Sequence, residues 1–431
     1  MYKTIFLGCI NRSGGSLLAR LFDGHPNVAS YPLEFGFPQN SKLYSIYKGY
    51  MGAAPTVIPD FDGSKEVNAY ELLSIPAQKP KVGVKWGKEH GDPMGVRQNY
   101  LEKAFYDSIT TDFDHDEFFR VFDKYRANAK NIAELYDALH RAYFGAWDKG
   151  KYIKKAEFIV FHSSSGFYLT NVDKYFADFK GSSFLHLIRD PLGEIGSEKT
   201  RLARRYYGSR RFAYPPFPNF LVKSYKHFDL KVHVKKWIVA ITRAKLLQEK
   251  YGVNSGFIVC KYENLLNYPE KTMKSLCKRT GLKYDPILLQ PTIANQPWGG
   301  NSHQGKQRGI NKNLIHYYPK VLKTKEIEFI KKKTDPIRNY MNESKDTPLD
   351  LTKLPKKYLF DYEYQRKYFD DKEKLLLYYA VMVKTPRQMD IRVPDFNAIV
   401  ACLYSEYVRI LHIPRLLKMR LFPGKGKQNY T

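Results

Sequence analysis

The chain has 431 residues and a mass of 50.3 kDa, with 43% hydrophobic and 26% charged residues. This composition is typical of a globular protein and excludes a wholly disordered chain. No apolar run reaches the roughly 18 residues of a membrane-spanning helix, and the apolar start at residues 4–10 is too short for a signal peptide. The cysteines share neither metal-ligand nor disulfide spacing, which favours a reducing, cytoplasmic location. They are Cys9, Cys260, Cys277 and Cys402.

The chain is strongly basic. Its 71 Lys and Arg against 43 Asp and Glu give a net charge of +28, and its isoelectric point is near 9.6. Such an excess indicates an anionic partner: nucleic acid, nucleotide phosphates, an acidic glycan or a membrane surface. Aromatic residues make up 15%, including 34 Tyr, which suits stacking on either RNA bases or sugars. Composition alone therefore leaves these classes of partner open.

Five short, nearly continuous apolar runs predict buried strands, because strands covered on both faces do not alternate in polarity. The predicted strands are residues 4–9, 82–86, 158–161, 184–188 and 257–260. Helical patterns at 16–22, 118–146 and 232–251 separate most of them. This alternation predicts a three-layer α/β domain with a central parallel sheet of about five strands.

The elements of this domain lie within residues 1–342, with a helical insertion at about 100–150. A Lys-rich helix is predicted over 323–340. The polar stretch 342–355 contains two prolines and is interpreted as a linker. A basic helical appendage is therefore predicted at 356–431.

The end of this appendage is a candidate membrane contact. Beyond Glu406 it holds no acidic residue and six cations, interleaved with apolar side chains. The cations are Arg409, Arg415, Lys418, Arg420, Lys425 and Lys427. This composition fits a peripheral segment on an anionic membrane. Because Pro414 and Pro423 divide it into short pieces, helices packed on the main domain remain the alternative.

The segment after the first predicted strand has the character of an anion-binding loop. It reads Arg12-Ser13-Gly14-Gly15-Ser16 and leads into a helix. Glycines let the backbone approach a phosphate or sulfate, and the N–H groups of a helix start favour negative charge. A kinase-type phosphate loop requires G-x-x-x-x-G-K-[ST]. Here Gly8 and Gly14 are one residue too far apart and Gly15 occupies the Lys position. Both departures argue against a kinase. An ordinary strand-to-helix turn remains the structural alternative.

A second anion site is predicted after the fourth strand. Arg189 stands at the strand end, and Pro191 two residues later can open a helix. Ser197 and Arg201 are four residues apart on that helix and share one face. Two guanidiniums and a hydroxyl at one place would hold a dianion such as a ribose phosphate, although a solvated basic face has the same composition.

Together the two segments resemble the binding motifs of the sulfotransferases that use 3′-phosphoadenosine 5′-phosphosulfate (PAPS). The first loop, followed by His25-Pro26 and Glu34, resembles the family's 5′-phosphosulfate loop. The second resembles its 3′-phosphate motif. Weaker matches are Tyr262-Glu263-Asn264-Leu265 and the late loop with Lys306 and Arg308. The resemblance covers roughly residues 1–342. Gly15 departs from it, because Thr or Ser is commoner there.

This resemblance implies a sulfotransferase domain of the P-loop-like fold that moves a sulfuryl group from PAPS to a hydroxyl or amine acceptor. A carbohydrate or glycolipid acceptor is expected, and no metal. The implied cofactor-binding residues are Arg12, Ser13, Gly14, Gly15, Ser16, Leu17, Arg189, Ser197, Arg201, Tyr262, Lys306 and Arg308. Two other functions remain as alternatives. One is a kinase-like phosphotransferase, and the other is a non-catalytic polyanion or nucleic-acid binder, which would explain the charge but not the ordered motifs.

Sulfuryl transfer needs stabilisation of the leaving group and removal of the acceptor proton. Arg12 is the candidate for the first role, with Ser16 and the loop amides beside it. Glu34 is the first candidate for the general base, since some branches of the family carry a catalytic Glu after the His-Pro element. His90 and His162 follow, because each lies just beyond or at a predicted strand end. A surface carboxylate and structural histidines are the alternatives.

Overall fold

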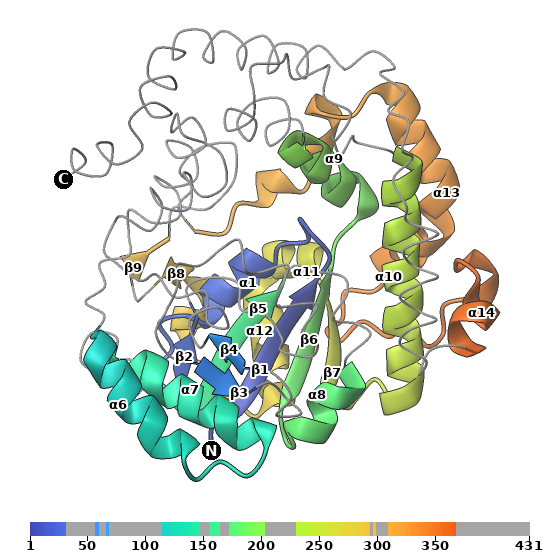
Figure 1. Ribbon diagram of the computed structural model, residues 1–431. Coiled ribbons are helices and arrows are strands. Elements are labelled where there is room, and N and C mark those ends of the chain that lie inside the picture. Colours follow the sequence, from blue (N-terminus) through green and yellow to red (C-terminus); the bar gives the residue numbers. More distant parts are fainter. Residues whose placement is uncertain are drawn as a thin grey trace, which may run out of the picture.

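The computed structural model has a five-stranded parallel sheet at its centre, in the order β2-β5-β1-β6-β7 (Figure 1). The described residues are 1–31, 57–59, 66–68, 114–146, 155–163, 172–202, 230–293, 296–298 and 309–367. The strands are β1 (Lys3–Cys9), β2 (Val28–Ser30), β5 (Phe158–Ser163), β6 (Ser183–Ile188) and β7 (Phe257–Lys261). The predicted three-layer α/β architecture is confirmed, and so are four of the five predicted strands.

The fifth strand of this sheet differs from the prediction. The stretch 82–86 lies outside the described residues, and β2 is the fifth member at the edge beside β5. Its pairing continues one residue further, where Tyr31 N donates to Val160 O over 2.9 Å. A three-residue strand is too short to show a hydrophobic period, so no sequence pattern predicts it. Two small antiparallel pairs lie outside the main sheet: β3 (Val57–Pro59) with β4 (Glu66–Asn68), and β8 (Thr292–Ile293) with β9 (Gln296–Pro297).

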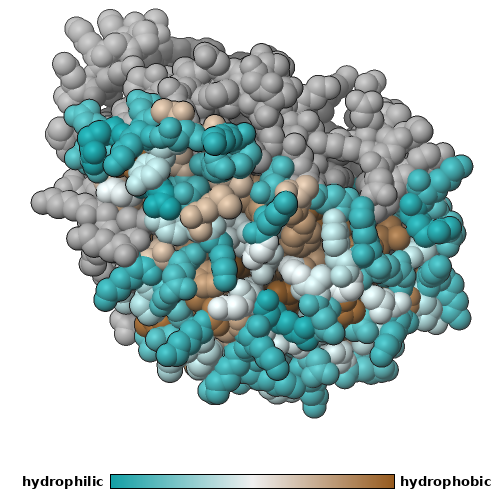
Figure 2. Space-filling view, turned by 90° about the horizontal axis from the view of Figure 1, so that it is seen from below, coloured by the Kyte–Doolittle hydropathy of each residue, from teal (hydrophilic) through white to brown (hydrophobic). Residues whose placement is uncertain are grey.

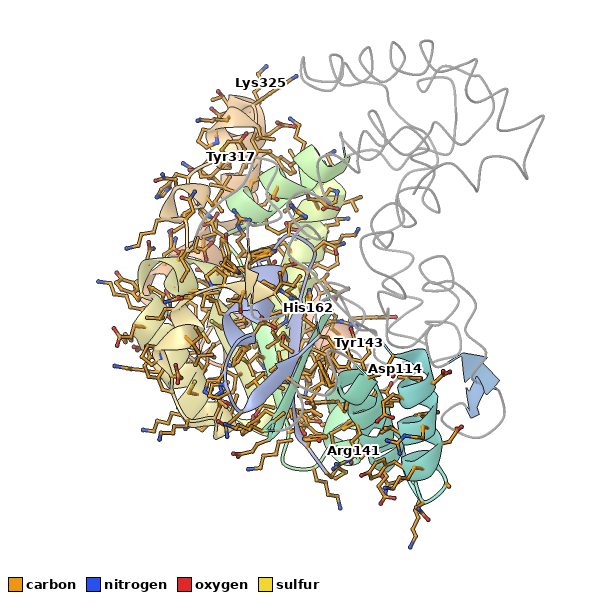
Figure 3. The ribbon with its side chains drawn as sticks, turned by 90° about the vertical axis from the view of Figure 1, so that its left-hand side faces the viewer. Asp114, Arg141, Tyr143, His162, Tyr317 and Lys325 are labelled. Carbon is orange, nitrogen blue, oxygen red and sulfur yellow. The ribbon has the colours of Figure 1, made fainter. Side chains whose placement is uncertain are left out.

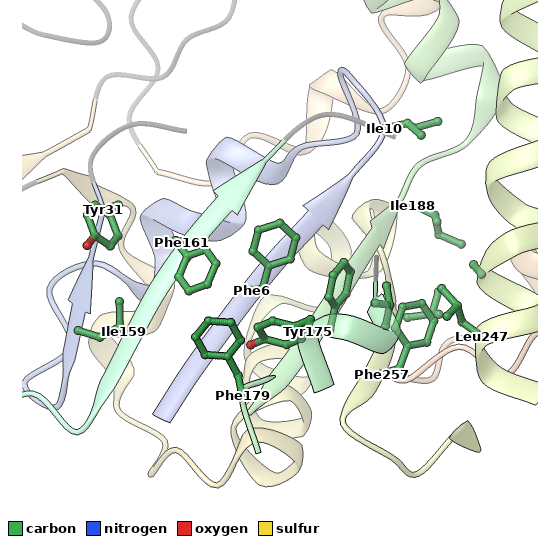
Figure 4. Close-up of a cluster of buried hydrophobic side chains, with 14 of the residues drawn as sticks. Phe6, Ile10, Tyr31, Ile159, Phe161, Tyr175, Phe179, Ile188, Leu247 and Phe257 are labelled. Carbon is green, nitrogen blue, oxygen red and sulfur yellow. The ribbon is translucent and has the colours of Figure 1, made fainter. Parts of the chain in front are cut away.

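Successive residues of each strand point to opposite faces, and both faces are covered. Ile5 and Leu7 pack with helix α1 (Gly15–Phe22) and with α11 (Tyr262–Asn267) and α12 (Pro269–Thr280). Phe6 faces the other way into an aromatic cluster, with its ring centroid 5.1 Å from that of Phe161 and 4.8 Å from that of Phe184 (Figure 4). The helices on this second face are α6 (His115–Arg126), α7 (Ile132–Ala146), α8 (Val172–Asp178) and α10 (Leu230–Tyr251). Both faces of the sheet are therefore core.

The predicted helical pattern at 118–146 consists of two helices, α6 and α7. Asp114 begins α6 by accepting a hydrogen bond from Glu117 N over 2.9 Å. Asn131 accepts one from Glu134 N over 3.0 Å just before α7. Short polar side chains at helix starts satisfy the first N–H groups of a helix. Asn131 therefore favours the start of a second helix here.

Helix α9 (Pro191–Leu202) lies beyond the carboxyl ends of the strands and packs against α10 and α13 (Thr324–Glu343) (Figure 1). The predicted Lys-rich helix is confirmed as α13. Lys199 joins α9 to the start of α13 through an ion pair with Glu326 Oε2 at 2.9 Å and a hydrogen bond to Val321 O at 3.0 Å. The shorter elements are η6 (Pro286–Leu289), η7 (Lys312–Leu314), η8 (Tyr318–Lys320), η9 (Lys356–Tyr358) and α14 (Tyr362–Lys367).

The interpretation of 342–355 as a linker is wrong, because this segment packs along the sheet edge. Leu349 N donates to Val259 O over 2.8 Å, so the segment covers the outer edge of β7. Gln248 of α10 donates to Leu349 O over 2.8 Å and accepts from Leu351 N over 2.7 Å. Leu349, Leu351 and Leu354 are all buried in the core cluster on the α10 side. The predicted appendage beyond 367 lies outside the described residues.

Figure 2 views the molecule from the end at which the strands begin, and hydrophilic residues dominate this face. Hydrophobic residues show there only as small separate areas, as expected for an ordinary protein surface. No helix in the described ranges is long and apolar enough to cross a membrane.

Replacing Leu351 tests the packing of this segment. Leu351→Ala removes a fully buried side chain and is expected to lower the free energy of unfolding by about 2–5 kcal/mol. The exposed neighbour Lys353 is the matched control, and Lys353→Ala should stay within about 0.5 kcal/mol of the parent. Chemical denaturation of both variants measures this, and equal stabilities would show that the segment contributes nothing to the core.

Candidate active site

The candidate site lies where β1 and β6 end side by side. The two strands pair in parallel, with Leu7 opposite Leu185 and Cys9 opposite Leu187. The chain leaves β1 towards β2 on one side of the sheet and leaves β6 towards β7 on the other. Parallel sheets bind ligands at such a reversal, beyond the carboxyl ends of the strands. Both predicted anion motifs begin at this point.

The loop after β1 is shaped by two residues in the left-handed region. Arg12 has φ 71° and Gly14 has φ 95°. A Cβ on Gly14 would lie 2.3 Å from the ring of Tyr262, so only glycine fits under this turn. A Cβ on Gly15 would lie 2.5 Å from Cys9 Sγ, so a larger residue there would require the Cys9 side chain to move. The family more often has Thr or Ser at position 15. In this chain the Cys9 side chain occupies the space that such a side chain would need.

Two further features make the loop receptive to an anion. Gly14 is the N-cap of α1, and no side chain of the described residues caps this helix. Ser13 is fully buried, and its Oγ has no hydrogen-bond partner among the described residues. A buried hydroxyl without a partner is uncommon, and a bound anion would supply one. The uncapped helix start adds N–H groups and a favourable dipole at the same place.

The structure brings the two predicted motifs into contact. Arg12 Nε donates to Ser197 Oγ over 3.0 Å, linking residues 185 positions apart. Arg189 is buried and donates from Nη1 to Arg12 O and from Nη2 to Leu314 O, both over 3.1 Å. A guanidinium has five N–H donors, so these two bonds do not exhaust it. Its Nε in particular has no partner among the described residues.

The Tyr262 ring packs against this guanidinium, and Gly193 leaves room for it. The Arg189 guanidinium carbon lies 4.6 Å from the ring centroid of Tyr262, the same ring that packs under Gly14. Gly193, in the first turn of α9, allows close approach, because a Cβ there would lie 2.8 Å from Arg189 Nε. The sequence interpretation did not single out Gly193. A glycine in the first turn of a helix that follows an Arg-Asp-Pro strand end was the signal for it.

The remaining predicted residues fall into three groups. Ser16 and Leu17 lie in the first turn of α1, both partly buried. Arg201 lies on α9, four residues after Ser197, and its side chain is outside the described set. Glu34, His90, Lys306 and Arg308 lie outside the described residues.

The predicted base candidate His162 occupies a different environment from the one expected. It lies on β5 opposite Leu7, fully buried in the interior (Figure 3). Burial, and then the positive charge of Arg20, lower the pKa of His162 to about 3. An imidazole with this pKa holds a proton too weakly to take one from an acceptor hydroxyl. The geometry therefore favours a packing role for His162.

Residues 4–286 match a family model described as the sulfotransferase family. The chain belongs to this family. No curated protein matches the chain. Among solved structures, the sulfotransferase domain from the curacin biosynthetic pathway is similar, at 14% identity and a TM-score of 0.39 over 78% of this chain and 98% of that one. The sulfotransferase domain from the Synechococcus PCC 7002 olefin synthase is 16% identical, with a TM-score of 0.38 over 77% of this chain and 94% of that one.

His162 generates a prediction for acid stability. Its pKa is about 3 in the folded chain and about 6.5 when unfolded, so between these values only the unfolded chain binds the proton. The free energy of unfolding therefore falls as pH falls below 6.5, by about 2 kcal/mol at pH 5. His162→Gln should lose about 2 kcal/mol less than the parent between pH 7 and pH 5. His316→Gln, at an exposed site, is the control and should keep the parent's pH profile. Identical profiles for parent and His162→Gln would contradict the buried, neutral imidazole.

Proposed function

We propose that this sulfotransferase takes its sulfuryl group from PAPS and transfers it to a hydroxyl or amine on a carbohydrate or glycolipid. The observation that carries the proposal is the contact between the two anion motifs, through the Arg12–Ser197 bond and the Arg189–Arg12 bond. PAPS bears negative charge at its 5′-phosphosulfate and at its 3′-phosphate. A site built from two adjoining basic motifs matches such a doubly anionic nucleotide.

The residues fit this donor. The first-turn amides of α1, the Ser13 hydroxyl and Arg12 would hold the 5′-phosphosulfate. Arg189, Ser197 and Arg201 would hold the 3′-phosphate. When bound, PAPS supplies the sulfuryl group and a nucleotide leaving group. The role of Arg12 is to place a fixed positive charge where negative charge develops on the leaving oxygen, which is how such transfers are accelerated.

The acceptor side of the proposal depends on residues outside the described ranges. Glu34 would take the acceptor proton, with His90 as the second candidate. Lys306 and Arg308 would complete the donor site. The Tyr-rich, basic composition supports an acceptor with sugar hydroxyls, and the basic end beyond Glu406 supports peripheral contact with an anionic membrane. A cytoplasmic enzyme acting on a membrane-proximal glycolipid would combine these features.

Turnover assays test the proposal. The full chain is incubated with PAPS and a panel of sugar and glycolipid acceptors, and 3′-phosphoadenosine 5′-phosphate (PAP) and sulfated product are quantified. Acceptor-dependent formation of both is expected, and Arg12→Ala should abolish it. Transfer of phosphate from ATP instead, or no consumption of PAPS with any acceptor, would contradict the proposal.

The 3′-phosphate assignment predicts a specific loss of affinity. Arg189→Ala should weaken PAP binding by about 2–5 kcal/mol, the scale for truncating one partner of a buried charged contact. Binding of AMP, which lacks the 3′-phosphate, should change much less. Lys278→Ala removes an exposed cation from the end of α12 and should leave both affinities unchanged. Calorimetry on the three proteins measures these affinities. If Arg189→Ala prefers PAP over AMP as strongly as the parent does, Arg189 does not bind the 3′-phosphate.

The base assignment predicts a loss of rate without a loss of donor affinity. Glu34→Gln keeps the size of the side chain but cannot accept the proton, so kcat should fall by about 10²–10⁴-fold. The PAP dissociation constant should stay at the parent value. Near-normal turnover in this variant would contradict the assignment of Glu34 as the base. His90 would then be the candidate, and kcat should fall in His90→Gln instead.

A further inference from the structure

Glu263, which no step of the mechanism uses, lies directly behind the Arg189 site. It follows Tyr262 in the first turn of α11 and is partly buried. Its Oε1 accepts a hydrogen bond from the backbone N–H of Asp190, the residue after Arg189, over 2.9 Å. Its Oε2 has no partner among the described residues. A buried carboxyl oxygen without a partner is unfavourable for stability, so the place of this carboxyl behind Arg189 calls for a functional reason.

That hydrogen bond belongs to a set that fixes the backbone on both sides of Arg189. Trp237 of α10 donates from Nε1 to Arg189 O over 2.8 Å. Asp190 accepts from Leu192 N over 2.9 Å at the start of α9, and from Arg338 Nε of α13 over 2.9 Å. Side chains from α10, α11 and α13 therefore converge on a single dipeptide, and only the Arg189 side chain extends from it towards the loop after β1.

Glu263 acts at this point as a hydrogen-bond acceptor, with the backbone N–H of Asp190 as the donor. Burial, and then the neighbouring Asp190 carboxylate, raise the pKa of the Glu263 carboxyl, while the hydrogen bond from Asp190 N–H and the charge of Arg189 oppose the shift. Asp190 already has a counter-charge in Arg338. What the strand end needs from position 263 is a hydrogen-bond acceptor for Asp190 N–H, and glutamine would supply the same acceptor.

We propose that Glu263 is a positioning residue for donor recognition. Its hydrogen bond to Asp190 N–H fixes the strand end from which Arg189 reaches the 3′-phosphate. This inference rests on the proposed function, since it assumes that Arg189 binds the 3′-phosphate of the nucleotide. It predicts that loss of the acceptor at 263 weakens recognition of that phosphate, although the side chain never touches the ligand.

The test compares Glu263→Met, which keeps the length and removes the acceptor, with Glu263→Gln, which keeps the acceptor. Calorimetry gives the dissociation constants for PAP and AMP. Glu263→Met should lower the preference for PAP over AMP by about tenfold, the scale of one buried hydrogen bond. Glu263→Gln should keep the preference of the parent. Gln248→Met is the matched control, because it removes two buried hydrogen bonds to the 349–351 backbone. It should lower the melting temperature and leave the preference unchanged.

The outcomes separate the two proposals. If the parent protein has no preference for PAP over AMP, the proposed function fails and the inference fails with it. If the parent has the preference and Glu263→Met keeps it, only the positioning role is overturned. If Glu263→Met does not fold, Arg338→Met is the second variant. Arg338 is partly exposed, and its loss removes the other side-chain hydrogen bond that holds Asp190. It should lower the same preference, and an unchanged preference would overturn the inference.

Discussion

The candidate site depends on the parallel pairing of β1 and β6. Both strands are buried on both faces, so their register is fixed by the core rather than by the loops that follow them. This pairing places Arg12 and Ser197 within hydrogen-bond distance although 185 positions separate them. A hydrogen bond from a charged donor contributes about 1.5–3 kcal/mol, which is enough to hold two loops together but too little to assemble them without the sheet.

The packing beneath the site explains which residues can occupy it. The Tyr262 ring supports the Arg189 guanidinium and also limits position 14 to glycine. Cys9 in turn limits position 15. The loop, the guanidinium and the start of α11 therefore pack against one another through the Tyr262 ring. In this family member the segments after β1 and β6 are therefore joined to each other by hydrogen bonds as well as to the sheet.

The sequence was sufficient where one periodicity or one motif decides the structure. Continuous apolar runs identified four buried strands, and the motifs after β1 and β6 were predicted at the two strand ends that the structure brings together. It was insufficient where tertiary packing decides. The edge strand β2 is too short to carry a pattern, and the segment 342–355 looked like a linker because its prolines and charges obscured the buried Leu349, Leu351 and Leu354. His162 stands near a strand end, but its side chain points into the core, which position alone does not reveal.

Calorimetric titration of the full chain with PAP, AMP and ATP tests the central claim most directly. We expect one binding site with a preference for PAP over AMP of at least about thirtyfold, because in the proposed site buried cationic groups would hold the 3′-phosphate. ATP, which lacks a 3′-phosphate, should bind no better than AMP. Equal affinities for PAP and AMP, or tighter binding of ATP, would show that the paired motifs beyond β1 and β6 are not a site for a 3′-phosphorylated nucleotide.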